Sequence, residues 1–159
     1  MSVTQPKERM LLTRTIAAAA LSLAGLVALP ATAHAASAAY TPEKICGPGF
    51  KRVADGHRPM KLRDGAVLGH VYLMYNKRTG RNCVTAVKTT YAGVRTDTGA
   101  YLEVKGGGRS EDRQKYKHYA ETGHIDGSWK CVKYAGWTRD PKGRVQASGG
   151  RDSWGNCAG

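Results

Sequence analysis

Four ionisable side chains that could support metal or acid–base chemistry lie within nine residues, in the segment HYAETGHID. They are His118, Glu121, His124 and Asp126. The spacing differs from the H-E-x-x-H pattern of helical zinc sites, and Gly123 interrupts any helix that would align the two imidazoles. On a strand, His118 and His124 would share a face while Glu121 would point away. We interpret these residues as ordinary polar side chains on the surface and expect no metal site. Metal binding or acid–base catalysis is the alternative.

A second set has the residue types that a small, basic, secreted ribonuclease requires. Such an enzyme needs a carboxylate base, a histidine acid and an arginine for the phosphate, and Glu103, His118 and Arg109 could take these roles. The sequence does not show that they converge, and it contains no G-x-S-x-G nucleophile motif. We therefore expect no enzymatic activity and no cofactor. A ribonuclease-like hydrolase and a secreted protease inhibitor remain the alternative functions.

Basic side chains are the most abundant functional groups. Lys and Arg number 25 against 12 Asp and Glu, a net charge of +13. Basic patches with interleaved aromatic residues favour non-specific polyanion binding, whereas the alternative is a solvated surface that keeps the protein soluble. With no nucleic-acid-binding motif in the chain, we expect an anionic cell-wall polymer as the partner and no specific nucleic acid. The candidate residues form two clusters: Lys77, Arg78 and Arg81, and Arg109, Arg113, Lys115 and Lys117.

The four cysteines predict two disulfides. Cys46, Cys83, Cys131 and Cys157 form an even set without the C-x2-C spacing of zinc sites. Three connectivities are possible, and we predict the sequential one, 46–83 and 131–157, because each pair would begin and end a compact β segment. Leu, Ile, Val and Phe supply 16 of the 124 residues from 36 onward. Such a thin aliphatic core requires these bridges.

The N-terminus has the three parts of an export signal. Lys7, Arg9 and Arg14 precede the apolar run 15–29, and alanines at 33 and 35 match a cleavage site. The run is shorter than the ~20 residues that span a bilayer, so we predict a cleaved signal peptide over 1–35 and no transmembrane segment. A second A-x-A at 36–38 allows cleavage at 38. We expect a flexible mature N-terminus over 36–44 and a single β domain over 45–159, secreted to the extracellular space or the cell surface.

The domain that would position these residues has an all-β pattern. Residues 66–75 are apolar on both faces, which predicts a central strand, and 76–82 predict a hairpin loop in which Gly80 takes the left-handed conformation. The polar segments 54–65 and 106–114 are predicted loops, and 128–137 a strand. About seven short strands with turn signals indicate a small, disulfide-stapled β-sandwich or barrel.

The mature chain also resembles a known family. The segments CGPGFK after residue 45, YNKRTGRNCV over 75–84 and NCA over 156–158, with four cysteines in matching contexts, resemble spore-associated protein A of filamentous actinobacteria. The resemblance implies a small secreted protein of the spore or aerial-hypha surface and brings no catalytic residues. We therefore expect a non-enzymatic protein of the spore or cell surface that electrostatic contact holds on an anionic cell-wall or spore-surface polymer.

Overall fold

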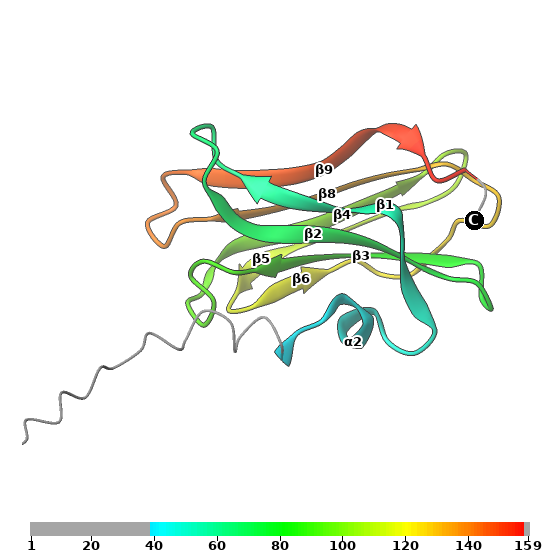
Figure 1. The fold of residues 1–159 in the computed structure, drawn as a ribbon, viewed down its shortest axis with the longest axis horizontal. Helices are drawn as coiled ribbons and strands as arrows, with labels where there is room; N and C mark the ends of the chain where they lie inside the picture. Colours follow the sequence, from blue (N-terminus) through cyan, green and yellow to red (C-terminus); the bar gives the residue numbers. More distant parts are fainter. Residues whose placement is uncertain (1–38, 158–159) are drawn as a thin grey trace, which may run out of the picture.

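The protein is an antiparallel β structure with one short helix in the described part of the chain (Figure 1). The computed structural model describes residues 39–157, so the predicted signal peptide and its cleavage site lie outside the described residues. The elements are α2 (Pro42–Cys46), β1 (Phe50–Lys61), β2 (Val67–Asn76), β3 (Arg81–Lys88), β4 (Thr96–Val104), β5 (Arg109–Tyr116), β6 (Tyr119–Glu121), β7 (Ile125–Asp126), β8 (Val132–Arg139) and β9 (Gln146–Gly155).

All nine strands belong to one sheet, which curls into a nearly closed barrel (Figure 1). The order is β5-β4-β8-β9-β1-β2-β3-β6, and β7 pairs with β3. At the seam between the first and last strands, β5 contributes side chains as acceptors. Asp112 accepts the backbone N–H of Glu121 at 3.3 Å, and Ser110 accepts that of Gly123 at 2.9 Å. The predicted all-β, disulfide-stapled fold is confirmed, with nine strands in place of about seven.

The barrel interior holds the main core. Val71 and Leu73 of β2 belong to the same buried cluster as Ala100 and Leu102 of β4, and Tyr134 of β8 is 1% exposed. Strands with alternating inward side chains fill a small barrel in this way. Tyr134 donates its hydroxyl hydrogen bond to the carbonyl of Asp55 at 2.9 Å. One tyrosine thus supplies apolar area that the few aliphatic residues do not.

A smaller core lies between α2 and the outside of the sheet, formed by Cys46, Phe50, Met74 and Cys83. Thr41 caps the helix by accepting the N–H of Lys44 at 3.3 Å. The disulfide Cys46–Cys83 joins the helix to β3. Residues 42–44, which the sequence placed in a flexible N-terminus, are therefore part of a covalently tethered helix.

The second disulfide, Cys131–Cys157, joins the start of β8 to the end of the described chain. Both disulfides are the sequential pairs predicted from the sequence. They close segments of 37 and 26 residues. Cys131 and Cys157 lie at the end of the barrel that carries the β2–β3 hairpin, and Cys83 belongs to β3.

Parts of two predicted loops are strands, whereas residues 62–65 and 106–108 lie outside any strand. Residues 54–61 continue β1, which carries a bulge between Arg52 and His57, with Asp55 at φ 60°. The bulge breaks the alternation by which a strand is recognised. Residues 109–114 belong to β5, whose inward positions are polar because they face the seam. The predicted strand 128–137 begins only at Val132.

Candidate functional site

The β2–β3 hairpin presents two basic side chains on a fixed backbone. Asn76 Oδ1 accepts the N–H groups of Arg78 at 3.0 Å and Thr79 at 3.3 Å, and its Nδ2 donates to the carbonyl of Pro48 at 3.1 Å. Gly80 adopts φ +68° and donates its N–H to the Asn76 carbonyl. The predicted hairpin is confirmed, and Lys77 and Arg78 are exposed at its tip.

A pocket of about 820 Å³ opens beside this tip, at the end of the barrel. It is walled by β1, by the hairpin and by the C-terminal residues that follow β9. Four cationic residues line it, two from β1 and two from the hairpin, and none of its lining residues carries a carboxylate. The lining residues are Gly49, Lys51, Arg52, Val53, Ala54, Tyr75, Asn76, Lys77, Arg78, Asn82, Asn156 and Cys157. Positive charge in a concave, partly apolar site favours an anionic ligand. We call these twelve residues the basic pocket.

Arg81, the third member of the predicted hairpin cluster, lies elsewhere. Its register partner is Asp126 of β7, and it lines a separate hollow with Glu121 and His124. Asp126 of β7 and Glu121 of β6 thus place two acidic residues beside Arg81. The cluster 77–81 is therefore divided: Lys77 and Arg78 belong to the basic pocket, and Arg81 does not.

The second predicted cluster runs along the outer face of β5, where alternation also places Glu111. Arg113 donates two hydrogen bonds to the Asp97 carboxylate of β4, at 3.0 and 2.8 Å, and Arg139 of β8 lies 3.5 Å from it. The hydrogen bond from Arg113 holds the pKa of Asp97 below its ordinary value. The positive charge of β5 is thus partly matched by neighbouring acids, although Lys115 and Arg109 are exposed.

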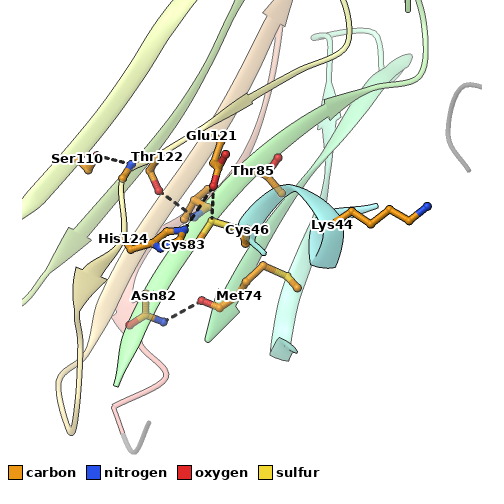
Figure 2. Close-up of a disulfide and its surroundings, with 12 residues drawn as sticks. Lys44, Cys46, Met74, Asn82, Cys83, Thr85, Ser110, Glu121, Thr122 and His124 are labelled. Atoms are coloured by element: carbon orange, nitrogen blue, oxygen red, sulfur yellow. Dashed lines mark hydrogen bonds and ion pairs between the residues drawn. A yellow bond between two sulfur atoms is a disulfide. The ribbon is translucent and has the colours of Figure 1, made fainter. Parts of the chain in front are cut away.

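The HYAETGHID group is divided by the fold. Glu121 Oε1 lies 3.4 Å from His124 Nε2 and 3.6 Å from Cys83 Sγ, beside the Cys46–Cys83 disulfide (Figure 2). Burial raises the pKa of Glu121. The two sulfurs are bonded to each other and so offer no thiolate to a metal. His118 instead stacks on Tyr40, with ring centroids 4.5 Å apart.

The three ribonuclease-type residues do not converge. Glu103 and Arg109 are register partners on β4 and β5, whereas His118 follows Tyr116 at the far end of this strand pair. Tyr116 lies seven residues after Arg109 along the strand, a span of about 23 Å at ~3.3 Å per residue. Geometry therefore does not assemble this set into one acid–base site.

Sequence reasoning missed two features. Trp129 is 82% exposed and lies in a turn, not in a strand. The preceding Asp-Gly-Ser, residues 126–128, is a turn signal that could have placed it there. In addition, His57 of β1 and His70 of β2 share a hydrogen bond of 2.9 Å between ring nitrogens, and burial lowers the pKa of both imidazoles. His70 thus has a histidine partner on the neighbouring strand.

These observations define a class: a small, basic, disulfide-stapled β-barrel with a cation-lined pocket at one end. Sequence comparison places it in a family. The chain is 32% identical over 116 residues to spore-associated protein A of Streptomyces coelicolor, covering 71% of this chain and 70% of that protein. The chain belongs to the spore-associated protein A family. No family model matches it, and no solved structure does. Within residues 39–157, no helix has the length and apolarity needed to cross a membrane.

Proposed function

We propose that this protein is a non-enzymatic component of the spore or cell surface that is held there by binding an anionic wall polymer in its basic pocket. The relative from Streptomyces coelicolor is named for its association with spores. Two disulfides suit an oxidising, extracellular compartment. The single observation that carries the proposal is the set of four cations, without a carboxylate, in the basic pocket.

The polymer would bind through exposed ends of flexible side chains. Lys77 and Arg78 project from a tip whose backbone is already ordered by Asn76, so binding would order side chains but no backbone. Lys51 of β1 lies opposite Tyr75 in the β1–β2 register, which places a cation at the pocket wall. A chain of negative groups could contact β1 and the hairpin at once.

Salt extraction tests this proposal. Electrostatic contacts between exposed groups are screened as the Debye length falls from about 10 Å at 0.1 M salt to about 3 Å at 1 M. We expect bound protein to leave spore or wall preparations within this range. The double variant Lys77→Gln/Arg78→Gln should leave at lower salt than the parent.

The matched control is Arg63→Gln/Lys142→Gln. It removes the same two charges from exposed turn positions at the opposite end of the barrel. We expect this control to be released like the parent. Equal behaviour of the two double variants would contradict a localised site, and retention of the parent at 1 M salt would contradict electrostatic binding.

A further inference from the structure

Trp129 is the most exposed of the large hydrophobic residues in the described chain, at 82%, and its backbone is in the left-handed region with φ 59°. A bulky side chain rarely adopts this conformation, which costs on the order of 1–3 kcal/mol. Exposure of an indole also forgoes the free energy gained by burying it. Neither feature contributes to stability, so a ligand is the natural explanation for both.

The turn that carries Trp129 is attached to the hairpin. Gly127 donates its N–H to the Gly80 carbonyl at 2.9 Å, and Ser128 Oγ lies 3.4 Å from the same carbonyl. A Cβ on Gly80 would lie 1.9 Å from Ser128 Oγ, so only glycine permits this approach. Cys131, two residues after Trp129, is fixed by its disulfide to Cys157. The indole is therefore held at a defined place beside the basic tip.

A hollow of about 450 Å³ lies between Trp129 and the hairpin. Its lining residues are Tyr75, Lys77, Arg78, Thr79, Gly80, Ser128 and Trp129. Tyr75, Lys77 and Arg78 also line the basic pocket, so the two sites are continuous across the hairpin tip. The nearby Asp126 carboxylate accepts hydrogen bonds from the N–H and hydroxyl of Ser128, which hold its pKa below the ordinary value.

We infer that this hollow is a sugar subsite, in which a ring of an anionic polysaccharide stacks on the Trp129 indole while its acidic groups contact Lys77 and Arg78. The inference rests on the proposed function and specifies its ligand. An aromatic face, hydroxyl-bearing Thr79 and Tyr75, and two cations match a charged pyranose ring. The neighbours of Trp129 in the hollow are polar or cationic apart from Gly80 and the Tyr75 ring, whereas insertion into a lipid surface requires an apolar face.

Two soluble polyanions separate stacking from charge. Polygalacturonate consists of anionic pyranose rings, and polyphosphate has similar charge without rings. The parent protein should bind both. Trp129→Ala should weaken binding of polygalacturonate about fivefold, the size of one aromatic stacking contact, and leave polyphosphate binding unchanged. Trp129→Phe should restore much of the loss because it keeps a ring. Lys77→Gln/Arg78→Gln should weaken binding of both polymers.

The matched control is Tyr91→Ala. Tyr91 is also an exposed aromatic residue, 40% exposed with φ 59°, but it follows β3 at the opposite end of the barrel. It should bind both polymers like the parent. If the parent binds neither polymer, the proposed function fails; if it binds both and Trp129→Ala changes neither or changes both equally, the sugar subsite alone is refuted. Trp129-dependent binding to phosphatidylglycerol vesicles, without an effect on polygalacturonate, would also overturn the inference.

Discussion

Two regions of the barrel are rich in basic residues but have different electrostatic environments. The hairpin end brings four cations together in a pocket lined without a carboxylate. The outer face of β5 carries Arg109, Arg113 and Lys115, but Glu111 lies among them and Asp97 is bound to Arg113. The positive charge that a surface offers to a ligand therefore depends on whether the neighbouring strands carry acidic residues. The number of Lys and Arg residues along one strand does not determine it.

The largest expected effect comes from removing the two disulfides, one at a time. Breaking either disulfide should cost about 3–4 kcal/mol of unfolding free energy by loop-closure entropy, for the 37- and 26-residue segments. Denaturant titration of Cys131→Ser/Cys157→Ser and of Cys46→Ser/Cys83→Ser measures this cost. The two variants serve as controls for each other.

Polymer binding should distinguish them. Cys157 lines the basic pocket and Cys131 ends the Trp129 turn, whereas Cys46 ties α2 to β3. Where both variants remain folded, we expect weaker polyanion binding in the Cys131/Cys157 variant and parental binding in the Cys46/Cys83 variant. The reverse order would show that the pocket does not depend on its covalent wall.

The local elements of the binding end could be predicted from the sequence, but the pocket could not. Asn76 and Gly80 identify the hairpin because a two-strand turn is a local structure. The pocket also requires Lys51 and Arg52 of β1 and the chain after β9. These meet the hairpin only because β1 lies between β9 and β2, a strand order that depends on long-range packing.

The wrong loop prediction for 109–114 has the same origin. A strand is recognised by apolar side chains on alternate positions. Ser110 and Asp112 occupy those positions in β5 because they accept backbone N–H groups across the seam. A polar pattern is therefore correct for a strand that closes the barrel through its side chains.

A third kind of basic residue is buried, and the effect expected of it lies between that of the disulfides and that of Asp97. Lys88 is 2% exposed, and its Nζ donates to the carbonyls of Val94 at 2.6 Å and Tyr116 at 3.1 Å. Burial lowers its pKa to about 8. Between this value and the ordinary one, the unfolded chain binds more protons. Stability attributable to Lys88 should therefore rise with pH above 8, by up to about 1.4 kcal/mol per pH unit.

Denaturation at pH 7.5 and pH 9.5 tests this effect against Lys88→Met. The parent should gain stability relative to the variant on going to pH 9.5, and both pH values lie below the pKa of about 12 to which burial and Asp112 raise Tyr116. Parallel pH profiles would show that the amine is not desolvated. Polymer binding of Lys88→Met should equal that of the parent, since this lysine offers no charge to a ligand.

The smallest effect concerns the acid that separates the two regions. Asp97→Asn removes the partner of Arg113 and a neighbour of Arg139, so it adds one positive charge and frees a guanidinium on β5. The pair is exposed to solvent, so its loss should have little effect on the free energy of unfolding at neutral pH. Because Arg113 lowers the folded pKa of Asp97, this contribution disappears anyway as acidification protonates the carboxylate.

We expect the salt concentration that releases Asp97→Asn from wall material to exceed the parent value slightly. Asp64→Asn is the control, since it makes the same charge change in the β1–β2 turn, where the Asp64 side chain accepts the N–H of Ala66.

The decisive comparison is the quadruple change of Arg109, Arg113, Lys115 and Lys117 to Gln, made in both the parent and Asp97→Asn. It should reduce retention more in Asp97→Asn than in the parent. An equal reduction would mean that Asp97 does not mask β5, and the contrast between the two basic regions would then rest on the shape of the pocket alone.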